Sequence, residues 1–135
     1  MIQSVPALYR GVPTIQWELD IDPAIGTVEI DPEQLRRALI NLVDNAVAAM
    51  NGTGTIQISA HHLAHDALRI VVADSGPGIP PADRDRMFVP YFSTKKRGTG
   101  LGLAIVHKVV SDHRGTIRIE DNTPQGARFV IEIPA

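Results

Sequence analysis

The chain contains no cysteine among its 135 residues, which excludes disulfide bonds, zinc–thiolate centres and cysteine nucleophiles. It also has no excess of basic residues, since the formal net charge is -2, so composition gives no bias toward nucleic acid or a membrane surface. No apolar run approaches the length of a membrane span, and residues 1–11 lack the apolar core of a signal peptide. Internal repeats and low-complexity tracts are also missing.

The composition that remains is typical of a soluble globular domain, with 44% apolar and 21% charged residues. Residues 1–13 give only weak structural signals, because Pro6, Gly11 and Pro13 interrupt any regular element. We therefore expect one domain over residues 14–135, preceded by the end of a linker over residues 1–13.

A helix is predicted between Asp31 and Asn51-Gly52. Asp31 can cap its start, Pro32 suits its first position, and Asn51-Gly52 is a common way to end a helix. Apolar residues recur at helical spacing between these limits. Asn41 and Asn45 lie four residues apart, so they share one face of this helix, beside the apolar stripe.

Short apolar or alternating runs predict strands on both sides of this helix. In residues 14–20, Ile15, Trp17 and Leu19 share the apolar face, and residues 27–30 are expected to complete a hairpin. Further strands are expected over residues 54–61, 68–73, 116–120 and 127–133.

Residues 79–99 show no clean period and are expected to form a long loop. Residues 101–110 are apolar almost all round, which predicts a buried helix that ends at His113-Arg114-Gly115. The order of elements differs from the βαβ alternation of a doubly wound sheet. It predicts an α+β fold, a two-layer α/β sandwich in which helices cover one face of a mixed, mostly antiparallel sheet.

The main chemical signal is a pair of glycine-containing segments, Asp74-Ser75-Gly76-Pro77-Gly78 and Gly98-Thr99-Gly100-Leu101-Gly102. Glycine lets backbone N–H groups approach phosphate closely, and a helix N-terminus adds unpaired donors and the positive end of a dipole. Taken alone, the first segment is equally well explained by a tight turn, and the second lacks the setting of a dinucleotide-binding motif. Two such turns facing one site indicate a bound nucleotide.

Two further segments place these turns in a recognisable order: NLVDNA at residues 41–46, DSGPG at 74–78, FVPYF at 88–92 and GTGLGL at 98–103. Together they resemble the N, G1, F and G2 boxes of sensor histidine kinases. The resemblance covers residues 14–134 and implies the catalytic ATP-binding domain of these enzymes, with the Bergerat fold shared with gyrase, MutL and Hsp90. The stretches RALINLVDNAVAAM and PYFSTKKRGTGLGLAIV, with the region of His113, look most like the nitrogen-regulation branch.

The resemblance implies ATP and Mg²⁺ as cofactors and gives each matching residue a role. Asp74 would accept a hydrogen bond from the adenine amine, which a guanine carbonyl cannot supply, while Gly76 and Gly78 let the chain pass close under the base. Asn45, assisted by Asn41, would hold Mg²⁺ through side-chain oxygen, since this ion needs few protein ligands when phosphate is present.

At the phosphate end, Lys95 or Lys96 would reach the β- or γ-phosphate as a point charge. Phe88, together with Tyr91 and Phe92, would anchor a lid formed by residues 79–99. The residues implied for cofactor binding are Asn45, Asp74, Gly76, Gly78, Ile79, Phe88, Lys95, Lys96, Thr99, Gly100, Leu101 and Gly102, and those implied for catalysis are Asn41, Asn45 and Lys95.

This sequence departs at one position from the ATP-hydrolysing members of the same superfamily, and the difference bears on whether ATP is hydrolysed or its phosphate transferred. They place a glutamate four residues before the magnesium asparagine, whereas this chain has Asn41, and an amide cannot act as a general base. Asp44 lies about 100° round the helix from Asn45 and is poorly placed to substitute. Transfer of phosphate is therefore favoured, and the alternatives are a hydrolytic ATPase, an anti-sigma-type serine kinase, or a non-catalytic interaction module.

The resemblance also implies partners. The phosphate acceptor would be a histidine on a dimerisation domain absent from this chain, and a response regulator would be served indirectly. His65 is not expected to be the acceptor, because the motif around it lacks proline and lies at a hairpin, while His107 and His113 are expected to pack or cap. No contact with nucleic acid or membrane is expected from this fragment, and the expected location is the cytoplasm, in a parent protein that is either soluble or membrane-anchored.

Overall fold

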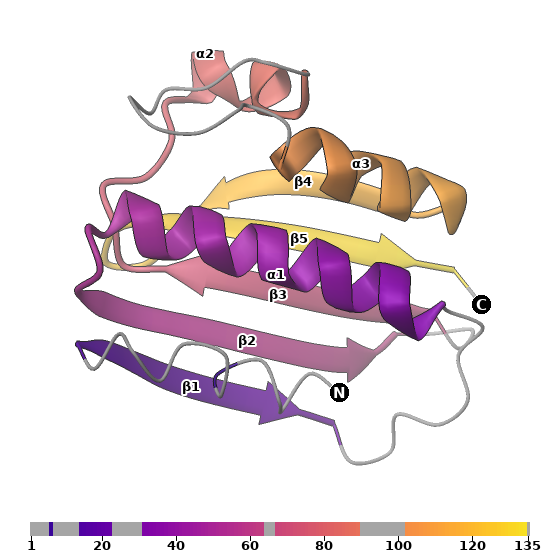
Figure 1. Cartoon of the computed structure of the whole chain (residues 1–135), viewed down its shortest axis with the longest axis horizontal. Coiled ribbons are helices and arrows are strands. Elements are labelled where there is room, and N and C mark those ends of the chain that lie inside the picture. The colour runs from indigo at the N-terminus through magenta and orange to yellow at the C-terminus, as the bar shows by residue number, and fades with distance from the viewer. Residues whose placement is uncertain (1–5, 7–13, 23–30, 64–66, 90–101, 135) are drawn as a thin grey trace.

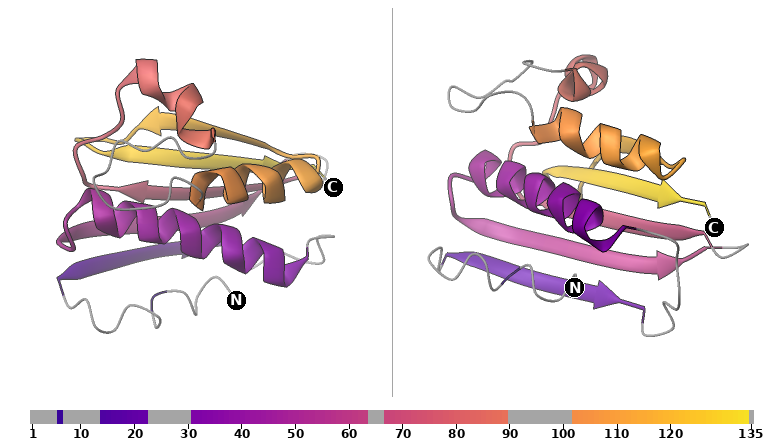
Figure 2. Two further views of the ribbon diagram at one scale, coloured as in Figure 1. Left: turned by 45° about the horizontal axis from the view of Figure 1, so that its top comes forward. Right: turned by 45° about the vertical axis from the view of Figure 1, so that its right-hand side comes forward.

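The computed structural model describes Pro6 and residues 14–22, 31–63, 67–89 and 102–134. Its elements, drawn in Figure 1, are β1 (Ile15–Ile21), α1 (Pro32–Ala49), β2 (Gly54–His62), β3 (Leu68–Asp74), α2 (Pro81–Arg84), the 3-10 helix η3 (Asp85–Phe88), α3 (Gly102–Asp112), β4 (Thr116–Asp121) and β5 (Ala127–Ile133). The strands form one five-stranded sheet in the order β1-β2-β3-β5-β4. Figure 2 shows α1 and α3 on the same face of this sheet, which confirms the expected two layers. Within the described residues, no helix combines the length and apolarity needed to cross a membrane.

The sheet is mixed, as predicted. β1 runs parallel to β2, whereas β2–β3, β3–β5 and β4–β5 are antiparallel pairs. Because α1 lies between β1 and β2 in the chain, it supplies the crossover that a parallel pair requires. The strand expected over residues 27–30 and the linker expected over residues 1–13, Pro6 apart, lie outside the described residues.

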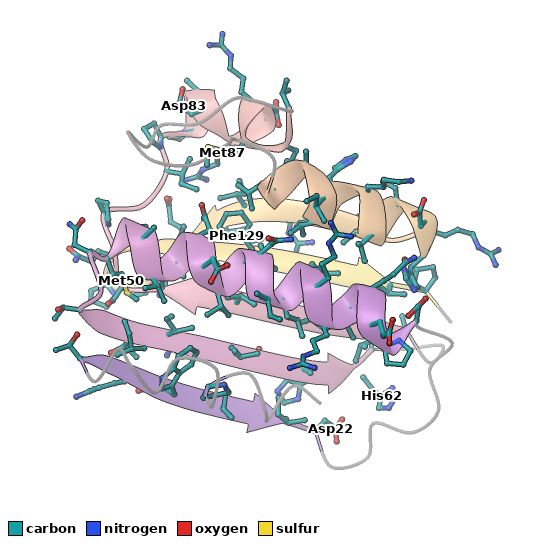
Figure 3. All side chains as sticks on the ribbon, in the orientation of Figure 1. Asp22, Met50, His62, Asp83, Met87 and Phe129 are labelled. Carbon is teal, nitrogen blue, oxygen red and sulfur yellow. The ribbon has the colours of Figure 1, made fainter. Side chains whose placement is uncertain are left out.

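Side chains alternate between the two faces of the sheet, and one face forms the core with the helices. Phe129 of β5, labelled in Figure 3, is fully buried on this face together with Leu39 and Leu42 of α1. Burying each such side chain stabilises the fold by about 1.5–3 kcal/mol. Leu19 alternates in step with Ile15 along β1, as expected, yet its side chain is 40% exposed, because β1 is the edge strand of the sheet.

The helix α1 begins and ends where its sequence predicts. Asp31 Oδ1 accepts hydrogen bonds from the backbone N–H groups of Glu33, at 3.0 Å, and Gln34, at 3.3 Å. Such a cap contributes about 1 kcal/mol. At the other end Asn51 has a φ of 54°, and the N–H of Gly52 donates to the Val47 carbonyl at 3.0 Å, which closes the last turn.

His113 links the two large helices, which agrees with the capping role expected for it. The backbone N–H of Asp31 donates to His113 Nε2 at 3.1 Å, and His113 Nδ1 lies 2.8 Å from the Val109 carbonyl oxygen. The imidazole accepts at Nε2, which leaves Nδ1 to donate to the Val109 carbonyl. This ring joins the start of α1 to the end of α3.

Two helical segments differ from their expected form. Residues 81–88 form α2 and η3 rather than loop, because elements of four residues each are too short to show a period. The prediction that α3 is buried all round is wrong: His107 and Lys108 are exposed, because the sheet and α1 cover only one side of the helix. The buried residues of α3 are Leu103, Val106, Val109 and Val110.

The face of the sheet opposite the helices carries linked ion pairs. Arg118 donates to Glu120 and to Glu132, each at 2.7 Å. The hydrogen bonds from Arg118 hold the pKa of both carboxyl groups below the ordinary value of 4.5, and burial opposes this only in part. The same bonds raise the pKa of the Arg118 guanidinium.

These depressed pKa values predict an acid-sensitive contribution to stability. The contribution is fully present above the unfolded pKa, near 4.5, and is lost as the pH falls through the lower folded pKa. We expect Arg118→Met to lower the free energy of unfolding modestly at neutral pH, since the groups are partly exposed, and to lower it less at about pH 3. Urea denaturation at both pH values tests this, and an equal difference at the two would contradict it.

Candidate nucleotide site

Asp74 is the one charged or polar side chain that is buried in the described part of the chain, with 3% of its surface exposed. It ends β3, and its Oδ1 accepts the backbone N–H of Gly76 at 2.9 Å and that of Ala127 at 3.3 Å. A buried carboxylate requires hydrogen bonds of this kind, because desolvation of an unpartnered charge is very unfavourable. The two N–H groups therefore fix the position of one oxygen of this carboxylate.

The glycines after Asp74 lie against neighbouring backbone. A Cβ added at Gly76 would lie 3.0 Å from Asp74 Oδ1, 3.4 Å from the Ala49 carbonyl oxygen and 3.4 Å from Met50 Cγ. Gly78 has a φ of 82° and would place a Cβ 3.2 Å from the carbonyl oxygen of Gly126. The segment thus passes between the end of α1, where Figure 3 labels Met50, and the turn that precedes β5.

Ser75 adds a third attachment for this segment. Its Oγ accepts the backbone N–H of Thr55 at 3.0 Å and lies 3.4 Å from Met50 Sδ. The segment after β3 is therefore held by β2 and α1 as well as by its own turn. A motif fixed in this way has little freedom to change shape when a ligand binds.

The start of α3 lies against the asparagine face of α1. A side chain added at Gly102 would place its Cβ 3.7 Å from Asn41 Oδ1. Asn41 and Asn45 are both half-buried, one turn apart on α1. Between Asn41, beside α3, and Ala49, beside Gly76, α1 rises by about 12 Å. One helix therefore connects both glycine motifs.

The other residues implied by the sequence are only partly described. Ile79 packs against the core, and the Phe88 ring lies 5.7 Å from His107 and 6.5 Å from Phe129, between centroids. Phe88 therefore packs between α3 and β5. The positions of Lys95, Lys96, Thr99, Gly100 and Leu101, and of Tyr91 and Phe92, lie outside the described residues.

Arg84 has a role that its sequence does not reveal. The alternating charges around it suggest a surface residue, yet its side chain is only 20% exposed. Arg84 Nε donates to the Ile79 carbonyl at 3.0 Å, and its terminal nitrogen lies 2.5 Å from Asp121 Oδ1. Arg84 therefore ties the segment after Gly78 to the end of β4.

The residues present suit a magnesium–nucleotide better than a metal held by protein alone. Among the described residues, no group of three or more histidine, aspartate or glutamate side chains is arranged to bind a metal ion. Asn41 and Asn45 offer amide oxygens, and Mg²⁺ is commonly held by one or two protein oxygens together with phosphate. The first N–H groups of α3, next to Asn41, suit an anion.

The sequence belongs to a known family. Residues 30–135 match the family described as histidine kinase-, DNA gyrase B- and HSP90-like ATPase. The sensor histidine kinase ZraS of Salmonella typhimurium is 38% identical over 120 residues, which cover 89% of this chain and 26% of ZraS. The chain thus corresponds to a minor part of that relative's length.

Solved structures give the same assignment. The catalytic domain of histidine kinase ThkA has a TM-score of 0.87 at 37% identity, with 98% of this chain and 90% of that chain covered. ThkA in complex with the response regulator TrrA gives 0.81 at 33%, covering 98% and 39%. Full-length ShkA in complex with AMPPNP gives 0.88 at 30%, covering 98% and 29%. The chain therefore belongs to the histidine kinase-, DNA gyrase B- and HSP90-like ATPase family, as a catalytic domain of the sensor histidine kinase type.

Proposed function

We propose that this domain binds ATP with Mg²⁺ along α1, from Asp74 to the start of α3, and donates the γ-phosphate to a histidine on a dimerisation domain outside this chain. The observation that carries the proposal is the buried Asp74 carboxylate, held by two backbone N–H groups beside Gly76. The AMPPNP bound to ShkA supports a nucleotide as the ligand.

Asp74 would select adenine by its charge and its fixed position. A carboxylate accepts hydrogen bonds only, so it pairs with the exocyclic amine of adenine and repels the carbonyl that guanine presents there. Because its Oδ1 is held by Gly76 and Ala127, the acid is positioned before the base arrives. Prepositioned groups lose little freedom on binding.

The phosphate end would rest on Asn41, Asn45 and the start of α3. Bound Mg²⁺ would supply neutralisation of phosphate charge, and Asn45 would contribute an oxygen ligand. Asn41 carries no basic group, so it cannot activate water for hydrolysis. This favours retention of the γ-phosphate for transfer, and it disfavours a hydrolytic ATPase. Lys95, Lys96, Thr99, Gly100 and Leu101 are proposed to complete the phosphate site.

The activity of a whole kinase involves parts that this chain lacks. We propose that residues 1–13 end a linker from the dimerisation domain, and that the phosphate passes from its histidine to a response regulator. The complex of ThkA with TrrA supports such a partner. The proposed location is the cytoplasm, where ATP is available. The similarity to the nitrogen-regulation branch remains a prediction.

Asn45→Ala is expected to remove most of the effect of Mg²⁺ on ATP affinity while leaving ADP binding without metal nearly unchanged. The reason is that the variant loses an oxygen ligand at the phosphate end but keeps Asp74 and its turn. Calorimetric titrations with Mg²⁺ and with a chelator measure both quantities. Gln34→Ala, an exposed amide on the same helix, serves as the control, and a full magnesium effect in Asn45→Ala would contradict the assignment.

A further inference from the structure

The turn between β4 and β5 makes side-chain contacts with the backbone of the Asp74 segment. Asn122 Nδ2 donates to the Asp74 carbonyl oxygen at 2.8 Å, and Gln125 Nε2 donates to the Ser75 carbonyl oxygen at 3.0 Å. Asn122 lies 48 residues from Asp74 in the chain, and Gln125 lies 50 residues from Ser75. Asn122 is partly buried, whereas Gln125 is exposed.

Asn122 makes a hydrogen bond to β3 just beyond the last residue pair of β3 with β5. The pairing of β3 with β5 runs from Leu68 with Ile133 to Ala73 with Arg128 and does not include Asp74. Asp74 is instead joined to β5 and the turn before it by two other hydrogen bonds: its carbonyl accepts from Asn122, and its Oδ1 accepts from Ala127. A buried carbonyl without a partner would be unfavourable, so the amide of Asn122 stabilises this end of β3.

The turn is also packed against Asp74 without spare room. Gly126 has a φ of 113°, and the position of a Cβ there is already occupied by the Asp74 carbonyl oxygen. The backbone N–H of Asn122 donates to the Gly126 carbonyl at 2.9 Å, which closes the turn on itself. A change in the side chain of Asn122 therefore acts directly on the Asp74 peptide group.

We infer that Asn122 is a positioning residue for base recognition: by holding the Asp74 carbonyl, it fixes the direction in which the Asp74 carboxylate points. The inference rests on the proposed nucleotide function. Asn122 does not act on the base itself. It sets adenine selectivity through Asp74, and Gln125, which is exposed and holds the next carbonyl, has a smaller influence.

The test compares Asn122→Ala and Asn122→Asp with wild type by titrating ADP and GDP below the unfolding transition. We expect Asn122→Ala to bind ADP about fivefold more weakly and to lose a similar factor in the ratio of ADP to GDP affinity. Asn122→Asp, which places an acceptor against the Asp74 carbonyl, should lose more. Gln57→Ala is the matched control, because its side-chain amide donates a hydrogen bond of 2.7 Å to Glu18 rather than to the backbone of Asp74 or Ser75.

Amide hydrogen exchange of Gly76 and Ala127, both held by Asp74 Oδ1, provides a second readout that needs no ligand. Faster exchange at both amides in Asn122→Ala, with an unchanged Gln57→Ala, supports the positioning role even if wild type binds no nucleotide. In that case the proposed function fails while the positioning of Asp74 stands. Unchanged exchange, or equal losses of ADP and GDP affinity, would overturn the inference.

Discussion

Asp74→Asn is expected to weaken ADP binding by about a hundredfold. This is the loss of affinity expected when one hydrogen bond to a charged group is removed at a desolvated site. The structure gives a specific reason. Oδ1 of residue 74 accepts two backbone N–H groups, from Gly76 and Ala127, and the asparagine oxygen has to keep this place. Its NH₂ group then points toward the amine of adenine, so two donors face each other.

The same exchange predicts a change of preference as well as a loss. An NH₂ group at this position suits the carbonyl of guanine. The variant should therefore lose more affinity for ADP than for GDP, so the ratio of ADP to GDP affinity should fall. Calorimetric titration with both nucleotides measures the ratio. Asp112→Asn, an exposed acid at the far end of α3, makes the same change in charge and should bind like wild type. An unaltered ratio in Asp74→Asn would contradict the assignment of Asp74 to the base.

Gly126→Ala is expected to abolish nucleotide binding and to lower the free energy of unfolding by about 2–5 kcal/mol. Two effects add: an alanine at a φ of 113° is strained, and its Cβ would occupy the place of the Asp74 carbonyl oxygen. To relieve that overlap, the turn has to move away from Asp74. This movement would also displace Asn122 and Ala127, which bind Asp74. Chemical denaturation and ADP titration measure the two losses.

Gly52→Ala separates the strain from the displacement of Asp74. Gly52 also has a positive φ, of 78°, but it closes α1 instead of packing on Asp74. Its substitution should lower stability by about 1–2 kcal/mol and leave ADP affinity unchanged. If Gly126→Ala bound ADP as well as Gly52→Ala does, the close packing of the turn on Asp74 would have no role in binding.

Local chemistry explains what the sequence predicts correctly. Asp31 and Asn51-Gly52 mark the ends of α1, because capping and left-handed backbone depend on residues close in the chain. Asn41 and Asn45 fall on one face because helical spacing requires it. The family resemblance implied that the start of α3 lies near Asn41 and Asn45, and in the structure Gly102 lies close to Asn41.

Long-range contacts explain what was missed. Arg84 and Asp121 lie 37 residues apart, and no local pattern links them. Asn122 and Gln125 look like ordinary turn residues until β5 is placed beside β3. Leu19 is exposed because β1 lies at the edge of the sheet. His107 is exposed because the sheet and α1 cover only the other side of α3. Sequence periodicity shows which residues share a face of an element, but it does not show which element packs against that face.

The proposed nucleotide site is tested most directly by a calorimetric titration of the wild-type domain with ADP and with ATP plus Mg²⁺, beside a thermal melt that shows the protein is folded. If Asp74 and the face of α1 form a nucleotide site, each adenine nucleotide binds at one site, ATP binds more tightly when Mg²⁺ is present, and GDP binds more weakly than ADP. A folded domain that binds neither adenine nucleotide would contradict the central claim that Asp74 and the face of α1 form a nucleotide site.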